Sequence, residues 1–287
     1  MTSPVLQTAP AGARRSPLTA AYARLTEVYA GLAVTELTAA DPDPDPAAGW
    51  VSTAALAAGG EALDAFLAWD DDQVRRDYGQ QARPDVVASF GLHRYAWPVC
   101  LLVTLPWFLH RRVPRIPVPA VHFNREAGRI ALRPGAFACL PGDPFADDPA
   151  ATVVRDEEAL RAEVRAAIAE HLTPLLAVFG PRMRRRGRAL WGMATDEIVE
   201  GLWYIGSLLG EEERAMAETG LLLPGGGRTT KPYAGGADFR TLAGPKGEDL
   251  ATRDRASCCL FYTLRPEDTC VTCPRTCDAD RIARLAP

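Results

Sequence analysis

Histidines are few in this sequence, and they are scattered. The four of them, His93, His110, His122 and His171, share no chelating spacing, which argues against a histidine metal site. The sequence also lacks GxSxG, P-loop, HExxH and convincing dinucleotide-binding patterns. Nothing therefore indicates a hydrolase, a nucleotide-binding enzyme or a zinc protease of the kinds that depend on these motifs.

A basic excess is missing as well. The formal net charge is -4 at pH 7, with both signs mixed along the chain, so a nucleic-acid partner is not expected. No apolar run suited to a signal peptide occurs near the start, and the most apolar stretch, Tyr95 to Leu109, is short for a membrane span. We expect a cytoplasmic protein without a transmembrane segment, in which cysteines stay reduced.

Apolar periodicity predicts a largely helical fold. Helices are expected at 20–34, 51–76, 84–110, 156–179 and 189–217. Pro98 and Pro106 should kink or end the third of them. Glycines within the helix expected at 189–217, such as Gly192 and Gly206, predict close approach of another backbone. Residues 118–134 predict a β-hairpin, whereas 223–257 have no clear period and predict a long loop.

Cysteines are crowded at the C-terminal end. Five of the chain's seven lie within SCCLFYTLRPEDTCVTCPRTC, from Ser257 to Cys277. Cys258 and Cys259 are adjacent, and Cys270 and Cys273 form a C-x-x-C chelating arm. The β-type run LFYTL and the turn RPED predict a hairpin that brings the two pairs together. In a reducing compartment such a cluster indicates a metal or redox site.

The spacing favours an iron–sulfur cluster over zinc or disulfides, although all three remain open. Structural zinc usually takes two separated C-x(2–4)-C arms. Neighbouring side chains such as Cys258 and Cys259 diverge, so they share one small tetrahedral ion poorly. Two irons lie apart and accept neighbouring thiolates more easily.

The C-C-x10-C-x2-C motif resembles that of the FhuF-like ferric-siderophore reductases. The residues that carry it are Cys258, Cys259, Cys270 and Cys273, and Leu190-Trp191-Gly192 is similar to a segment upstream of the cluster in that family. The resemblance implies a [2Fe-2S] cluster on these four thiolates. Cys277 is an additional thiol, which is either a bystander or a substitute ligand. Asp278 is expected to cap a terminal helix, 279–285.

The sequence is predicted to divide into three parts, and the resemblance implies an activity. Residues 1–80 would be an N-terminal helical segment with a flexible leader, 1–17, and a Pro-rich linker. Residues 81–250 would be an α+β reductase core, and 251–287 a [2Fe-2S]-binding lobe. The predicted fold class is α-rich α+β, a helical bundle with a small antiparallel sheet and a cysteine-rich lobe. The implied activity is one-electron reduction of siderophore-bound Fe(III). Electron transfer to another oxidised substrate or enzyme and a non-catalytic zinc-binding module are the alternatives.

Such a reductase requires a ferric siderophore as substrate and an electron donor such as a ferredoxin or a flavin reductase. Arginines close to the cysteines, Arg255, Arg265 and Arg275, would favour the reduced cluster. The chain has further candidates for contacts with an anionic chelate or an acidic partner. They are Arg182, Arg184, Arg185, Arg186, Lys231 and Tyr233.

Overall fold

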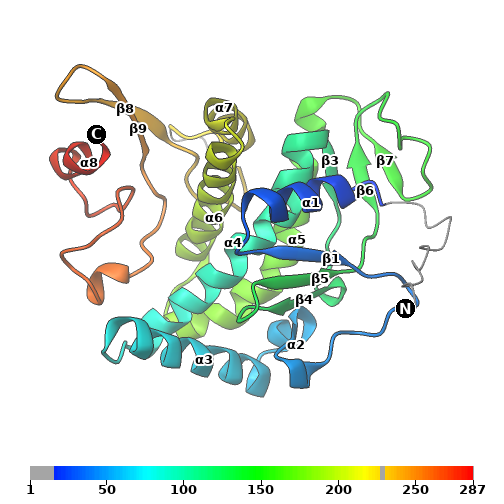
Figure 1. Ribbon diagram of the computed structural model, residues 1–287, viewed down its shortest axis with the longest axis horizontal. Helices are drawn as coiled ribbons and strands as arrows, with labels where there is room; N and C mark the ends of the chain where they lie inside the picture. Colours follow the sequence, from blue (N-terminus) through cyan, green and yellow to red (C-terminus); the bar gives the residue numbers. More distant parts are fainter. Residues whose placement is uncertain (1–15, 227–229, 287) are drawn as a thin grey trace, which may run out of the picture.

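The computed structural model describes residues 16–226 and 230–286, so most of the expected flexible leader, 1–17, lies outside the described residues. A long buried helix, α4 (Pro84–His110), runs through the centre of the fold (Figure 1). Four other helices pack around it: α1 (Thr19–Val28), α3 (Gly60–Tyr78), α5 (Glu157–Met183) and α6 (Gly187–Leu208). Because α4 is surrounded, apolar residues occur on all its faces.

The two prolines inside α4 do not end it. The helix continues through Pro98 and Pro106 to His110, because neighbouring helices support the turns that lose a backbone hydrogen bond. Among the described residues, α4 is also the one helix long and apolar enough to cross a membrane, but 78% of its most apolar window is buried inside the protein. It is the core helix of the fold.

The sheets lie beside this helical core, and two of them are mixed rather than antiparallel. The larger sheet has the order β1-β5-β4-β2, with β1 parallel to β5. Its strands are β1 (Ala33–Glu36), β2 (Val51–Ser52), β4 (Val121–Asn124) and β5 (Arg129–Leu132). A second sheet combines β3 (Arg112–Pro114), β6 (Phe137–Cys139) and β7 (Ala151–Val153), with β6 parallel to β7. The α-rich α+β class is confirmed, as is the β4–β5 hairpin.

Several expected helices are shorter or divided. The first ends at Val28, and residues 33–36 form strand β1, because they pair with β5 across the sequence. Gly59, with a φ of +74°, separates α2 (Thr53–Ala58) from α3. Gly210, with a φ of +73°, separates α6 from α7 (Glu212–Leu222). Both glycines adopt left-handed conformations that other residues reach only at a cost.

The stretch expected to be a loop contains an antiparallel hairpin. Strands β8 (Phe239–Ala243) and β9 (Asp249–Arg253) pair along their whole length. Helix α8 (Asp278–Leu285) follows the cysteines as expected, but its N-cap is Cys277 and not Asp278.

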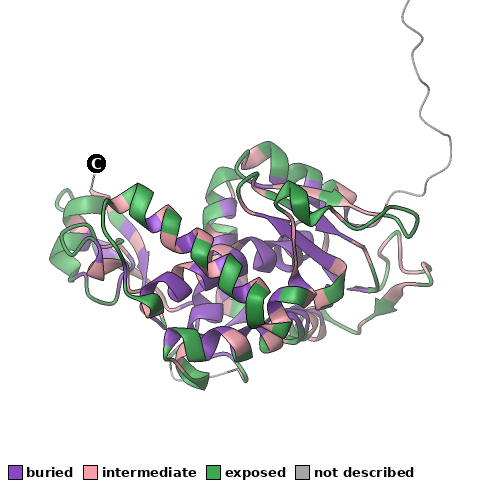
Figure 2. Cartoon of the chain, turned by 90° about the horizontal axis from the view of Figure 1, so that it is seen from below, coloured by how far each residue is buried: buried purple, intermediate pink, exposed green. Residues whose placement is uncertain are grey.

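One hydrophobic core joins the N-terminal segment to the rest of the fold. Tyr22, Leu25, Leu56 and Leu63 belong to the same buried cluster as the apolar residues of α4, α5 and α6. The Tyr22 hydroxyl donates a hydrogen bond to the backbone carbonyl of Leu102, 3.0 Å away in the middle of α4. The buried residues form a continuous layer through the molecule (Figure 2).

Close packing of α6 against α7 leads to a stability prediction. A Cβ atom at Gly206 would overlap the Cβ of Ala215, whereas a Cβ at Gly220 in α7 would meet nothing within 4 Å. We expect Gly206→Ala to lower the free energy of unfolding by about 1–3 kcal/mol through overpacking. Gly220→Ala, the matched control, should raise it by about 0.5–1 kcal/mol through helix propensity. Urea denaturation measures both, and equal effects would contradict the packing described.

Candidate functional site

The cysteine segment forms a lobe beside α6, between β9 and α8 (Figure 1). The predicted hairpin within this segment is wrong, because Phe261–Thr263 forms a single 3₁₀ turn and not a strand. Leu260, with a φ of +68°, reverses the chain directly after the cysteine pair. The apolar run does not pair with a strand but packs onto helices, since the Phe261 ring contacts the rings of Tyr78 and Phe90.

Four thiols of the lobe lie near one another. Burial raises the pKa of the Cys259 thiol, and the nearby thiols of Cys258 and Cys273 raise it as well. Burial also raises the pKa of Cys270, with Cys259 and Cys273 contributing in the same direction. The guanidinium of Arg255 opposes the shift at both sites, with its Nη1 atom 4.0 Å from the Cys270 sulfur.

Backbone amides point at two of these sulfurs. The Leu260 N–H donates to the Cys258 Sγ at 3.4 Å, and the Arg275 N–H donates to the Cys273 Sγ at 3.5 Å. Such N–H···S hydrogen bonds stabilise thiolates and help to set the potential of iron–sulfur clusters.

A buried carboxylate on α6 holds the segment that leads into the cysteines. The two oxygens of Asp196 accept hydrogen bonds from the Ala256 N–H (2.9 Å), the Ser257 N–H (2.8 Å) and the Ser257 hydroxyl (2.7 Å). Asp196 Oδ1 also accepts a hydrogen bond from Nη2 of Arg253 at 2.8 Å, and both of these side chains are fully buried. The position of Cys258 is therefore fixed from the helical core by the residue directly before it.

Two buried arginines, Arg253 and Arg281, connect the segments of the lobe to one another and to α6. Arg253, at the end of β9, also donates to Glu200 of α6 at 3.0 Å, and Glu200 accepts a further hydrogen bond from the Thr272 hydroxyl at 2.9 Å. Arg281 of α8 is buried, and its guanidinium donates to the carbonyl oxygens of Cys273 (3.2 Å) and Arg253 (3.0 Å). The loop that carries the C-x-x-C pair is thus tied both to α6 and to the terminal helix.

Helices α4 and α6 also contact the lobe directly. The Ser89 hydroxyl of α4 donates to the carbonyl oxygen of Cys259 at 3.0 Å. On α6, a Cβ at Gly192 would lie 3.2 Å from the carbonyl oxygen of Ala256, so this glycine marks the close backbone approach that the sequence predicted.

The comparison with known families agrees with this arrangement. Residues 255–275 match the family described as FhuF 2Fe-2S C-terminal domain. The C-terminal segment is an FhuF-type 2Fe-2S domain. The resemblance drawn from the cysteine spacing is confirmed, and the match indicates a [2Fe-2S] cluster as cofactor. No curated protein matches the chain.

The donor chemistry of the FhuF-type domain fits that cofactor. A [2Fe-2S] cluster takes four thiolates, and Cys258, Cys259, Cys270 and Cys273 supply four in one region. Among the residues that the structure describes, no three His, Cys, Asp or Glu side chains are arranged so that they could hold a single metal ion. The fifth thiol, Cys277, is exposed at the N-cap of α8.

The positively charged residues predicted around the cluster differ in position. Arg255 lies against the thiols, whereas the guanidinium of Arg265 lies over the Tyr78 ring and that of Arg275 over the Tyr262 ring. Of the candidates for substrate contacts, Tyr233 is buried, and its hydroxyl donates to the carbonyl oxygen of Arg165 at 2.7 Å. Its side chain therefore does not line a docking face.

The other candidates for substrate contacts lie at the ends of α5 and α6 or in the loop before β8. Arg182 pairs with Asp64, and Arg184 is the left-handed C-cap of α5. Arg185 contacts the sulfur of Met193, and Arg186 is the N-cap of α6. Lys231 is exposed. None of these five residues lines a cavity of about 620 Å³ that lies between α3, α4, the β4–β5 turn and α6.

His93 on α4 lines that cavity, and sequence analysis gave it no role. Its Nδ1 lies 2.7 Å from Glu197 Oε1, and Glu197 is buried next to Asp196 on α6. Burial alone would lower the pKa of His93, but the Glu197 carboxylate outweighs burial and raises it. The pairing joins residues 104 positions apart, so no local pattern could have indicated it.

The carboxylate of Asp196 leads to the second prediction. Asp196→Asn removes the charge that partners Arg253 and replaces one acceptor oxygen by a donor that faces other donors. We expect a loss of about 3 kcal/mol in the free energy of unfolding, because the buried guanidinium of Arg253 loses its fully buried carboxylate partner and keeps only Glu200. Limited proteolysis should cleave the lobe faster, and less cluster should remain bound per chain.

Asp71→Asn provides the matched control. It breaks a solvent-exposed ion pair with Arg75 on α3. Such a pair contributes at most about 1 kcal/mol. If both variants unfold at the same urea concentration and retain the same amount of cluster, Asp196 does not hold the lobe.

Proposed function

We propose that the chain is a cytoplasmic ferric-siderophore reductase whose [2Fe-2S] cluster is held by Cys258, Cys259, Cys270 and Cys273. The observation that carries this proposal is the FhuF-type 2Fe-2S match over the same residues, in a lobe where these thiols lie close together. The family indicates an oxidoreductase, and the substrate and the ligand set are our inference.

When bound, the cluster supplies one electron at a time, passing from its reduced to its oxidised form as Fe(III) of the chelate becomes Fe(II). The chain's own residues prepare for this transfer by stabilising negative charge at the thiolates. The guanidinium of Arg255 and the backbone N–H groups of Leu260 and Arg275 all lie against cysteine sulfurs. Positive charge and N–H donors favour the reduced, more negative form of the cluster and so raise its reduction potential.

The chemistry of siderophores explains why a single electron is sufficient. Hydroxamates, catecholates and carboxylates hold Fe(III) through hard oxygen donors. Fe(II) binds them far more weakly and exchanges faster, so reduction releases the metal without breaking a bond to carbon. The reaction needs no nucleophile and no general base. An electron donor such as a ferredoxin or a flavin reductase must then reduce the cluster again.

The ligand set leads to the third prediction. Replacing Cys258, Cys259, Cys270 or Cys273 by Ser should abolish or distort the visible and EPR spectra of the cluster, because an alkoxide oxygen replaces a soft sulfur ligand. Cys277→Ser, the matched control in the same lobe, should leave both spectra nearly unchanged. The ligand set is wrong if Cys277→Ser bleaches the protein and Cys273→Ser does not. A colourless protein with stoichiometric zinc would contradict the cluster itself.

Reductase activity is the fourth prediction, and stopped-flow mixing tests it. Anaerobic protein reduced with dithionite and freed of excess reductant should be reoxidised on mixing with a ferric siderophore, with one Fe(II) formed per cluster. An Fe(II)-specific chelator reports the product, and the return of cluster absorbance reports the oxidation. If hydroxamate, catecholate and carboxylate chelates all fail to reoxidise the protein, it transfers electrons to another oxidised substrate or enzyme.

A further inference from the structure

Five exposed arginines close to the cysteine lobe have no carboxylate partner among the described residues. They form the basic surface and are Arg184, Arg186 and Arg188 at the junction of α5 and α6, and Arg265 and Arg275 in the lobe. Residues 181–188 hold five arginines and no Asp or Glu, although the formal net charge of the whole chain is -4. Positive charge gathered on one part of a net negative protein attracts an anionic partner to that part.

The junction of α5 and α6 lies beside the start of α4. His93 of α4 pairs with Glu197 of α6. One turn further along both helices, a Cβ at Gly201 would lie 3.5 Å from Nε1 of Trp97. The two helices therefore run side by side in the same direction, and both begin at the same end of the molecule.

On α6, the basic surface continues the face that holds the cysteine segment. Arg188 lies one turn before Gly192, where a Cβ would be 3.2 Å from the carbonyl oxygen of Ala256. Asp196, a further turn along, accepts hydrogen bonds from Ser257. Arg188 thus stands at the exposed end of the same face that positions the residues leading into the cysteine pair.

The start of α4 joins the basic surface to the cysteine pair from the other side. Hydrogen bonding from Arg83 is the main cause that lowers the pKa of Asp85, and Arg184 lowers that pKa as well, so Arg184 lies near the start of α4. Ser89, one turn after Asp85, donates to the carbonyl oxygen of Cys259 at 3.0 Å. Both helices thus connect the arginines at the junction to the loop that carries the thiols.

The thiols reach the surface at Cys270, which is exposed. Arg265 and Arg275 are exposed on either side of it in the sequence. Glu267 and Asp268 lie in the intervening turn and offset part of this charge, so most of the positive excess comes from the junction of α5 and α6. Electron transfer slows steeply with distance, and an exposed cluster ligand lets a second redox protein approach closely.

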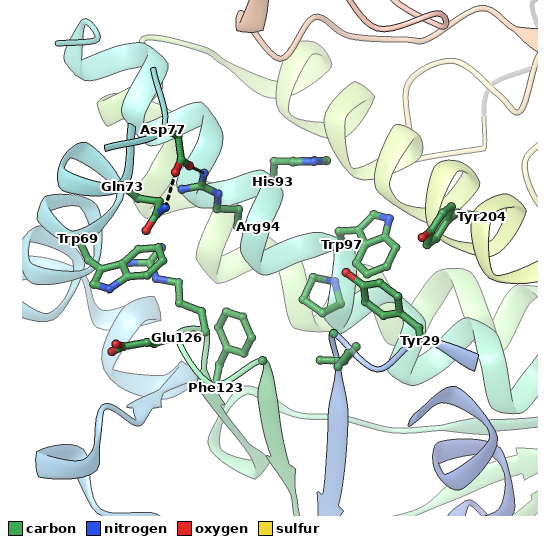
Figure 3. Close-up of a pocket in the computed structure, with 15 residues that line it drawn as sticks. Tyr29, Trp69, Gln73, Asp77, His93, Arg94, Trp97, Phe123, Glu126 and Tyr204 are labelled. Carbon is green, nitrogen blue, oxygen red and sulfur yellow. Dashed lines mark hydrogen bonds and ion pairs between the residues drawn. The ribbon is translucent and has the colours of Figure 1, made fainter. Parts of the chain in front are cut away.

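The basic surface is separate from the 620 Å³ cavity. Figure 3 shows the lining of this cavity, which includes Trp69, His93 and Tyr204. None of the five arginines lines it. Small molecules bind mainly in concave sites, whereas arginines spread over separate segments suit the larger contact area of a protein partner.

From these observations we propose that the basic surface docks the electron donor, and that this donor is a small acidic one-electron carrier protein of the ferredoxin type. The inference rests on the proposed reductase function, which requires a donor. One electron passes from the reduced iron–sulfur cluster of the carrier to the oxidised cluster of this chain, with no bond formed or broken and no proton transferred. Carboxylates of the carrier pair with the guanidinium groups and steer the encounter toward Cys270.

Calorimetric titration of the oxidised holoprotein with an oxidised plant-type [2Fe-2S] ferredoxin, an acidic protein, tests the docking. Arg188→Glu should weaken binding about tenfold at low salt. A carboxylate is compatible with the first turn of α6. Arg155→Glu is the matched control, because Arg155 is 85% exposed and directly follows β7, at the opposite end of the molecule from the lobe (Figure 1).

Salt and electron transfer provide two further measurements. Wild-type binding should weaken as salt rises from about 0.01 M to about 0.15 M, because the Debye length falls from about 30 Å to about 8 Å. Ferredoxin in catalytic amount, kept reduced by NADPH and ferredoxin–NADP reductase, should bleach the visible absorption of the holoprotein. Bleaching of Arg188→Glu should be about tenfold slower than that of Arg155→Glu, and mixtures without ferredoxin give the background rate.

The outcomes separate this proposal from the reductase function. Equal ferredoxin affinities for Arg188→Glu and Arg155→Glu, or no binding by the wild type, would overturn the docking surface. So would an Arg188→Glu variant that loses reoxidation by ferric chelates but keeps ferredoxin binding, since the arginines would then serve the chelate. The function stands in these cases if chelates still reoxidise the dithionite-reduced wild type.

Ferredoxin binding that depends on Arg188 supports the surface even if no chelate accepts an electron, and the reductase function alone would then fail. The visible spectrum of each variant before titration confirms that its cluster is intact.

Discussion

The buried carboxylate of Asp196 is the constraint on which the functional part of the structure depends. A charge without access to water is stable only if hydrogen-bond donors satisfy it, and here Arg253 and the backbone and side chain of Ser257 do so. Those donors belong to the segment that enters the cysteine pair. The helical core thus positions a lobe that has little hydrophobic core of its own.

Helix α4 connects the cysteine lobe to the cavity lined by His93. It is buried as the centre of the core, yet Ser89 and His93 reach outward on one face to the cysteine lobe and to the cavity. A rigid helix holds the two at a fixed separation, which a loop could not do. The proposed one-electron transfer would benefit from such a fixed geometry more than from any additional reactive group.

How much the sequence could predict depended on whether an interaction was local. The spacing of Cys258, Cys259, Cys270 and Cys273 indicated the cofactor, and helical periodicity indicated α4 and α5, because these patterns are complete within short segments. Strand β1 exists only through its pairing with β5, almost a hundred residues later, so its sequence resembled the end of a helix. Asp196 looked like an ordinary polar position on α6, because its partners lie in another segment of the chain.

The cysteine lobe and the cavity lined by His93 differ in their distribution of charge. Thiolates need nearby positive charge, and Arg255 together with backbone N–H groups supplies it. Two arginines that line the cavity, Arg94 and Arg125, are already paired with the carboxylates of Asp70 and Asp77. Their positive charge is therefore largely neutralised within the protein.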